Sequence, residues 1–321
     1  MPTISRTLVT LALLLPLLSH AGGDAGTCHY VPVAKLDIDF SERTLRPIVG
    51  GSVNGMPVRM LVDTGAYETK LLKASAERLG LTPRSTGRYS EGVGGSAINY
   101  VANVDDFSLG GIHTGRTRMP VLGARDGGDR DLIVGANYLL QTDMELALAE
   151  RYLRFFRASG CDDTYLAYWS SDAMEIPFAG RVGRTNQPLV NIELNGVRLK
   201  ALLDTGATQT VVTRRGAELA GVRVDGPGAV KASRVGGIGD ALLDSWSADF
   251  KRFRIGDETV NNPRLRIVDD FPQGRTTEFD VVLGVDFLRA HRILFAMSQD
   301  RLYMSYLGGE LFGAHQRAPA P

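Results

Sequence analysis

The chain has 321 residues, of which 44% are hydrophobic and 22% charged, so it can bury a large core and is not intrinsically disordered. Lysine plus arginine and aspartate plus glutamate both number 36, so the formal net charge is +0. Without a basic surplus, we expect no nucleic-acid partner. The length fits one large domain or two of ordinary size.

The first residues have the features of an export signal. A short apolar run over 8–18 is followed by Ser19-His20-Ala21, a small-x-small cleavage pattern. The run is too short to span a bilayer. We therefore predict a signal peptide over 1–21, a mature chain that is periplasmic or secreted, and no stable membrane insertion after cleavage. An uncleaved anchor is the alternative.

The chain has two cysteines, Cys28 and Cys161. In an oxidising compartment an even pair favours a disulfide over two free thiols. This bond would join an N-terminal segment over 22–45 to a connector over 161–175. Lipidation of Cys28 stays open as an alternative. The cysteines and histidines show no metal-ligand spacing, so we predict no metal site and no cofactor.

An internal repeat dominates the sequence. Residues 53–66 recur as 194–207, which places Asp63-Thr64-Gly65 on Asp204-Thr205-Gly206 at an offset of 141. A second block, 131–139, recurs as 280–288 at an offset of 149. Because the two blocks recur in the same order and the second has a slightly larger offset, the sequence indicates a duplicated lobe. We predict lobes over 46–160 and 176–307, and a flexible tail over 308–321.

Each copy is predicted to be mostly strand. Asn-Gly pairs at 54–55 and 195–196 indicate tight hairpins, and the apolar residues after them run into each Asp-Thr-Gly. Short helices are expected over 72–79 and 213–220, ended by Gly80 and Gly221, with another after Gly135 and after Gly284. The fold class is therefore mainly β.

Two Asp-Thr-Gly turns in equivalent lobes suggest paired carboxylates. A pseudo-two-fold association brings equivalent turns face to face. Asp63 and Asp204 could not then both ionise easily, so they would share one proton. Such a pair supplies a general base for a water molecule and a general acid for an amide carbonyl.

These motifs resemble those of aspartic proteases of the pepsin/retropepsin superfamily, specifically a bacterial secreted protein whose two lobes each resemble a retroviral-type subunit. The resemblance is carried by 62–66 and 203–207, with Ala66 and Ala207 in the fourth place, and by the hydrophobic-hydrophobic-Gly elements 133–135 and 282–284. It implies two β-barrel lobes in a bilobal, pepsin-like arrangement. It also implies an endopeptidase that acts on peptide or protein substrates as a monomer.

The resemblance also implies roles for individual residues. Thr64 and Thr205 would exchange hydrogen bonds between the lobes, while Gly65 and Gly206 would let the turns pack tightly. Flap tips that cover the substrate are expected at Gly92, Val93, Gly94 and Gly95 in the first lobe and at Gly236 and Gly237 in the second, with ordinary loop glycines as the alternative.

Three points stay open at this level. Tyr89 and Tyr100 flank the first glycine cluster, but neither matches the flap tyrosine of the pepsin branch securely. A non-catalytic peptide-binding or scaffolding protein of the same fold is the rival interpretation, because a fold does not fix a function. The sequence also does not separate general degradation from regulated processing.

Overall fold

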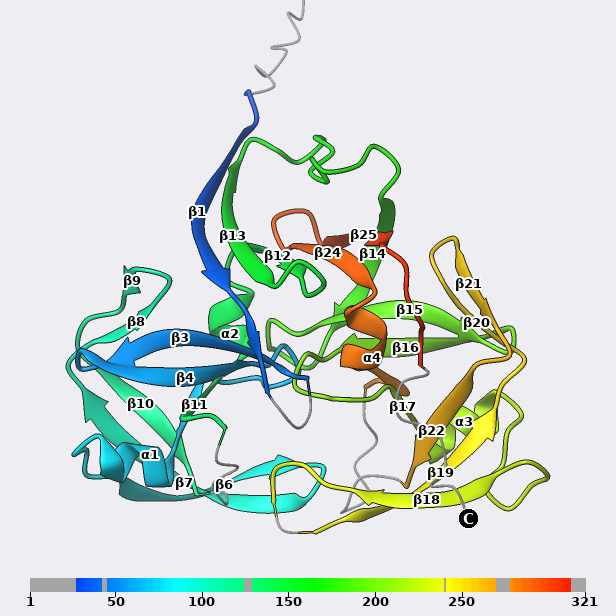
Figure 1. Cartoon of the computed structure of the whole chain (residues 1–321), viewed down its shortest axis with the longest axis horizontal. Helices are drawn as coiled ribbons and strands as arrows, with labels where there is room; N and C mark the ends of the chain where they lie inside the picture. Colours follow the sequence, from blue (N-terminus) through cyan, green and yellow to red (C-terminus); the bar gives the residue numbers. More distant parts are fainter. Residues whose placement is uncertain (1–26, 42–44, 124–128, 240, 270–277, 313–321) are drawn as a thin grey trace, which may run out of the picture.

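The computed structural model describes residues 27–41, 45–123, 129–239, 241–269 and 278–312. The expected signal peptide over 1–21 lies outside these ranges. Among the described residues, no helix is both long enough and apolar enough to cross a membrane. The described chain is mainly β, as the sequence predicts, and its strands form two lobes joined by a shared sheet (Figure 1).

The first lobe is built on a ten-stranded sheet with the order β6-β7-β10-β5-β11-β4-β3-β8-β9, and β2 lies beside β3. The strands are β2 (Asp39–Phe40), β3 (Pro47–Val53), β4 (Met56–Val62), β5 (Lys70–Leu72), β6 (Arg84–Gly92), β7 (Gly95–Val104), β8 (Phe107–Leu109), β9 (Ile112–His113), β10 (Thr117–Leu122) and β11 (Leu132–Val134). The helices are α1 (Lys73–Arg78) and α2 (Ala136–Leu139).

The second lobe repeats this plan on the other side of the molecule (Figure 1). Its strands follow the order β15-β16-β23-β17-β22-β19-β18, with the hairpin β20–β21 beside β15. They are β15 (Pro188–Leu194), β16 (Val197–Leu203), β17 (Val211–Thr213), β18 (Val230–Val235), β19 (Leu243–Asp249), β20 (Arg252–Ile255), β21 (Glu258–Asn261), β22 (Arg264–Val268) and β23 (Val281–Leu283). The helices are α3 (Arg214–Leu219) and α4 (Val285–Leu288).

The lobes share a sheet in the order β1-β13-β12-β24-β25-β14. Its strands are β1 (His29–Asp37), β12 (Asp143–Ala147), β13 (Tyr152–Ser159), β14 (Met174–Arg181), β24 (His291–Ala296) and β25 (Arg301–Tyr306). At its centre β12 of the first lobe pairs with β24 of the second, and Glu145 faces Leu294. These residues are also 149 positions apart, the offset of the second repeat block, so the pseudo-two-fold axis passes through this pair.

Each hydrophobic-hydrophobic-Gly element lies beneath an Asp-Thr-Gly turn. Strand β11 runs parallel to β4, and β23 runs parallel to β16. The backbone N–H of Asp63 donates to Val134 O at 3.0 Å, and that of Asp204 donates to Leu283 O at 2.9 Å. A Cβ at Gly135 would collide with the backbone of Ala66, so the tight packing requires glycine there.

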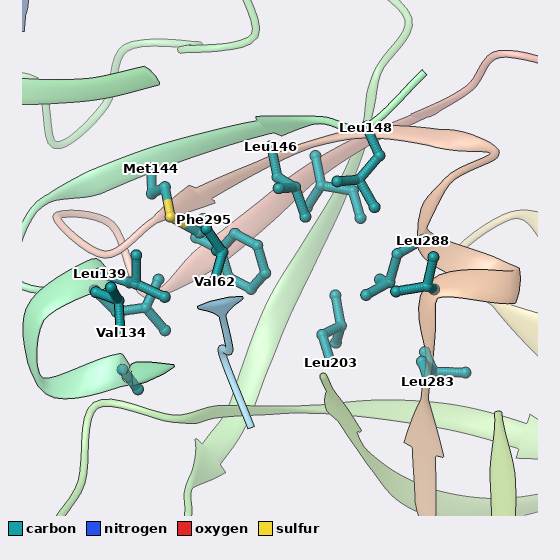
Figure 2. Packing of buried hydrophobic residues seen from close by; sticks show 14 of the residues in the cluster. Val62, Val134, Leu139, Met144, Leu146, Leu148, Leu203, Leu283, Leu288 and Phe295 are labelled. Carbon is teal, nitrogen blue, oxygen red and sulfur yellow. The ribbon is translucent and has the colours of Figure 1, made fainter. Parts of the chain in front are cut away.

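Buried apolar side chains around the turns hold in place the two strands, β4 and β16, that lead into them. Figure 2 shows Val62, Val134 and Leu139 on the left and Leu203, Leu283 and Leu288 on the right, with Met144, Leu146 and Phe295 of the shared sheet in the upper part of the view. All these side chains are 2% exposed or less. The core of both lobes is therefore continuous through the shared sheet, which holds the two turns on one rigid support.

The helices follow the predicted positions within one residue at each end. Helix α1 is flanked by Leu72 and Leu79, and α3 by Thr213 and Ala220. The Thr213 side chain accepts a hydrogen bond from the Gly216 N–H at 2.9 Å, which caps α3. Gly80 and Gly221 have positive φ angles of 72° and 78°, as expected for residues that end helices.

The predicted disulfide between Cys28 and Cys161 is confirmed. The segment 22–45 contains β1, which forms an edge of the shared sheet. The connector stops short of 175, because β14 begins at Met174. The flexible tail expected from Gly308 onward does not include Phe312, which is 3% exposed and packs against Phe253 and Phe287. Residues 313–321 lie outside the described residues.

Candidate active site

The two Asp-Thr-Gly turns meet at the interface between the lobes and are locked by their threonines. The Thr64 N–H donates to Thr205 Oγ1 at 3.0 Å, and the Thr205 N–H donates to Thr64 Oγ1 at 3.1 Å. Each hydroxyl donates in turn to the strand of the opposite lobe, Thr64 to Leu203 O at 2.8 Å and Thr205 to Val62 O at 2.6 Å. Both threonines are 0% exposed. These hydrogen bonds, which run from each lobe to the other, fix the position of one turn relative to the other.

The glycines of the turns leave room for the opposite carboxyl group. A Cβ built at Gly65 would collide with the carboxyl of Asp204, and one built at Gly206 would collide with the carboxyl of Asp63. Each glycine therefore faces the aspartate of the other lobe. The structure thus brings Asp63, Thr64, Gly65, Asp204, Thr205 and Gly206 into one compact site.

The carboxyls of Asp63 and Asp204 are half-buried, and each lies against the glycine of the opposite turn. Asp63 Oδ1 accepts from the Ala66 N–H at 2.8 Å, and Asp204 Oδ1 accepts from the N–H groups of Gly206 at 2.7 Å and Ala207 at 3.2 Å. Burial raises the pKa of both carboxyls, and the negative charge of Asp63 raises the pKa of Asp204 further. Such a pair retains one proton above the range of an ordinary aspartate.

Two arginines that the sequence analysis did not single out lie within electrostatic reach of this pair. Arg46 and Arg130 both lower the pKa of Asp63, which opposes part of the effect of burial. Burial and the charge of Arg130 lower the pKa of the Arg46 guanidinium, while the carboxylates of Asp129, Asp63 and Asp204 act in the opposite direction. The repeat shows only that Arg46, before Pro47, is equivalent to Gln187, before Pro188. Nothing in the sequence showed that these positions approach the carboxyls.

The two predicted flap tips touch each other. The Gly94 N–H donates to Ile238 O, and the Ala241 N–H donates to Gly94 O, both at 2.8 Å. A Cβ at Gly92 would collide with Ile238, and one at Gly237 would collide with Val93. Figure 1 shows β6 and β18 approaching from opposite lobes to form this contact. Gly95, with a φ of 96°, turns the first tip, and Gly236 lies against Leu242.

A buried lysine ties the first predicted flap to the residues that follow the first Asp-Thr-Gly turn. Lys70 is 4% exposed, and its ammonium donates to the Ser90 hydroxyl on β6 and to the Tyr67 hydroxyl at 3.1 Å. Glu68 Oε2 lies 3.3 Å from the same nitrogen. The equivalent position in the second lobe is Val211, so only the first lobe can make this connection. Tyr89, by contrast, is 61% exposed.

The fold and the site define an aspartic protease architecture. A family model for aspartyl proteases matches residues 49–138 and 190–287, which together are more than half of the chain. The chain therefore belongs to the aspartyl protease family. Each matched range contains one Asp-Thr-Gly turn and one flap tip. A comparison with curated proteins gives no significant match.

Proposed function

We propose that this protein is an aspartic endopeptidase in which Asp63 and Asp204 activate one water molecule. The observation that carries the proposal is the pair of carboxyls, one from each lobe, that each lie against the glycine of the opposite turn and are held in register by the hydrogen bonds between Thr64 and Thr205. Family membership supports the same reaction class. A protein that only bound peptides would gain nothing from two carboxylates whose ionisation is mutually unfavourable.

In the proposed reaction Asp63 is the base and Asp204 the acid. The cations Arg46 and Arg130 favour the charged form of Asp63, while the charge of Asp63 keeps the proton on Asp204. Asp63 takes a proton from water, the water oxygen bonds to the amide carbon, and Asp204 protonates the carbonyl oxygen. In the tetrahedral intermediate Asp63 returns its proton to the amide nitrogen as the C–N bond breaks. Asp204 regains a proton from the hydroxyl that becomes the carbonyl of the new acid.

The turns support this reaction by holding the carboxyls in place, and the flaps support it by covering the bound peptide. The hydrogen bonds between Thr64 and Thr205 hold the two turns together, so a water between the carboxyls would need little reorganisation before attack. The flap tips would open to admit an extended peptide and close over it, excluding bulk water. No step requires a cofactor, and two lobes in one chain make the site complete in a monomer.

The experiment is turnover of a mixed peptide library by the wild type, by Asp63→Asn and by Asp204→Asn. Each substitution removes one half of the proton-sharing pair, so kcat/KM should fall by about a hundredfold to ten-thousandfold. Asp105→Asn changes an exposed carboxylate of the first lobe and should leave turnover unchanged. A statine-type inhibitor should block the wild type. Peptide binding by the wild type without hydrolysis would instead indicate a binding protein of this fold.

We also propose that the mature protein is exported and acts in the periplasm or outside the cell. The small-x-small pattern at 19–21 and the Cys28–Cys161 bond support this location. N-terminal sequencing of the protein from the periplasmic and culture fractions should give a chain that begins at Gly22. Recovery of the uncleaved chain in the membrane fraction would contradict this.

A further inference from the structure

A pocket of about 370 Å³ opens between the residues that follow the first Asp-Thr-Gly turn and the loop that joins β14 to β15 in the second lobe. Its first-lobe wall includes Tyr67 and Glu68 after the turn and Asn137 of α2. Its second-lobe wall is the loop segment 184–186. The pocket is therefore built from both lobes, and ligand sites commonly lie at such interfaces.

A direct contact places the loop beside the first Asp-Thr-Gly turn. Gln187, at the end of the loop, donates from Nε2 to the backbone O of Gly65. The loop is closed by hydrogen bonds from the Val182 N–H to Gln187 O and from the Thr185 N–H to Val182 O, both at 3.0 Å. On the opposite wall, Tyr67 is two residues beyond Gly65. An extended peptide advances about 3.3 Å per residue, so one whose scissile bond lies at the carboxyls would reach the pocket within a few residues.

The acidic side chain that lines the pocket has its counter-charge in the first lobe. Glu68 Oε2 lies 3.3 Å from Lys70 Nζ, and Lys70 is 4% exposed. The same ammonium donates to the Tyr67 hydroxyl at 3.1 Å and lies 4.9 Å from the centroid of the Tyr67 ring. These contacts hold Glu68 and Tyr67 on their wall. The negative charge of Glu68 is therefore balanced by Lys70.

Two other side chains of the pocket have hydrogen-bond donors without acceptors in the described part of the chain. Arg184 is exposed, and its guanidinium makes no hydrogen bond or ion pair with any described residue. Asn137 Oδ1 accepts from the Thr69 N–H at 2.8 Å and from the Thr69 hydroxyl at 2.9 Å, which leaves Nδ2 as the other half of the amide. The pocket therefore offers a guanidinium and an amide N–H₂ group to a ligand.

One further carboxylate adjoins the loop. Glu278 accepts from the Gly183 N–H, with N···O distances of 3.0 and 3.1 Å to its two carboxylate oxygens. No ion pair joins it to the neighbouring Arg184 within the described ranges. The charge of Glu278 weakens the positive field of Arg184, but it does not occupy the guanidinium N–H groups.

The second lobe differs from the first at the position of the amide. At the offset of 149, Asn137 corresponds to Asp286. Asp286 Oδ1 accepts from the Thr210 N–H at 2.8 Å and from the Thr210 hydroxyl at 2.7 Å, as Asn137 does with its own threonine. Arg43, the equivalent of Arg184, lies outside the described residues. The fold therefore accepts either an amide or a carboxylate at this position, and only the first lobe has the amide donor.

We infer that this pocket is a subsite for an acidic substrate side chain, aspartate or glutamate, bound by Arg184 and by Asn137 Nδ2. The inference rests on the proposed peptide hydrolysis and adds a substrate preference to it. One oxygen of the substrate carboxylate would accept from the guanidinium and the other from the amide, and charge-assisted hydrogen bonds of this kind are stronger than neutral ones. The Tyr67 ring, fixed by Lys70, would pack against the methylene groups of the same side chain.

The test compares peptides that differ at one position only. A cleaved peptide from the library is resynthesised with Glu, Gln or Lys at each of the four positions on either side of the scissile bond. At one position on one side, kcat/KM for Glu should exceed that for Gln by about tenfold, and Lys should be worst. The preference should shrink as sodium chloride is raised, because it is electrostatic.

Variants of the two donors assign the preference to the pocket. Arg184→Gln should bring the Glu-to-Gln ratio close to one, while Arg184→Lys should keep it above one. Asn137→Asp, which copies Asp286 of the second lobe, should lower the ratio to one or below, because it adds a carboxylate that competes for Arg184. Arg198→Gln, at an exposed arginine of β16, controls for net charge and should keep the full ratio. Thermal melting shows whether each variant is folded, and Arg184→Gln decides alone if Asn137→Asp is unfolded.

The results separate the subsite from the proposed activity. Equal hydrolysis of the Glu and Gln peptides at every position, or a preference that survives Arg184→Gln, would overturn the subsite and leave the protease standing. If the wild type hydrolyses nothing, statine-type peptides with Glu or Gln at each of the same positions are titrated into it by calorimetry. Tighter binding of one Glu peptide that is lost in Arg184→Gln would then support the subsite while contradicting catalysis. Equal binding at every position would overturn both.

Discussion

Gly65 and Gly206 make the active site possible because each leaves space for the carboxyl of the opposite lobe. We expect Gly65→Ala to push Asp204 away, with a destabilisation of about 1–3 kcal/mol and a loss of most activity. Gly50→Ala is the matched control, since a Cβ at Gly50 in β3 meets no atom within 4 Å. Thermal melting and peptide turnover measure both effects. Normal turnover of Gly65→Ala would mean that the carboxyls are not held as closely as the structure places them.

The pH dependence of activity follows from the raised pKa values of the two aspartates. Activity should fall on the acid side when Asp63 becomes protonated and on the basic side when the shared proton of the pair is lost. Since burial raises the pKa of both groups above the usual range, we expect a bell-shaped kcat/KM profile centred at about pH 5–6.

The residues at 66 and 207 allow this pH prediction to be tested. Alanine offers no side-chain donor to the carboxylates, whereas serine could donate a hydrogen bond to the charged form and lower its pKa. Ala66→Ser with Ala207→Ser should therefore move both limbs of the profile to lower pH. The measurement is kcat/KM for one peptide from pH 2 to 8. A wild-type optimum at pH 2–3, or no acid-ward shift in the variant, would contradict the argument.

At the scale of elements, the first flap depends on a single buried ammonium. Lys70→Val, which copies the Val211 of the second lobe, removes the donor that Ser90 and Tyr67 share. Strands β6 and β7 should then exchange backbone hydrogens faster, and KM should rise by about tenfold with a smaller change in kcat. Hydrogen exchange and steady-state kinetics measure this. Lys73→Gln, at an exposed lysine paired with Glu77, should leave both unchanged.

The elements that the sequence predicted well are those with a local signal. The Asn-Gly turns, the apolar runs into each Asp-Thr-Gly and the glycines that end α1 and α3 all act within a few residues, and the repeat supplied each of them twice. The aspartate pair was predictable because duplication implies a pseudo-two-fold axis. Lys70 could not be assigned a role from the sequence, because its partner Ser90 lies twenty residues away on another strand.

At the scale of the whole molecule, the shared sheet was the part that sequence patterns could not predict. Strand β1 has an irregular burial pattern and pairs with β13 more than a hundred residues later. A pairing between strands so far apart along the chain produces no repeating hydrophobic pattern in the sequence of either strand. The cysteines were the exception, since Cys28 and Cys161 indicated that these two ends meet. The sheet determines whether the two Asp-Thr-Gly turns face each other at all.

A buried charge network at the centre of this sheet joins the lobes. Glu145 on β12 is 0% exposed and accepts from Arg292 Nε of β24 at 2.7 Å. It also accepts from the Tyr152 hydroxyl at 3.0 Å and from the Tyr168 hydroxyl of the connector at 2.7 Å. Arg154 Nη1 lies 3.9 Å from Glu145 Oε2 as a second, more distant cation. Because the carboxylate has no access to water, its charge is stabilised by these groups, which come from both lobes and from the segment between them.

Breaking this network from one side should therefore destabilise the whole protein. We expect Arg292→Met to cost about 3–5 kcal/mol, because it removes the nearer of the two cations beside a buried carboxylate. Adding Glu145→Leu, which copies its symmetry partner Leu294, should recover much of that loss, since the two apolar side chains then need no counter-charge. Urea unfolding of the single and double variants measures the coupling. An unchanged unfolding midpoint in Arg292→Met would show that the ion pair does not hold the lobes together, and the apolar packing of β12 on β24 would then have to do so alone.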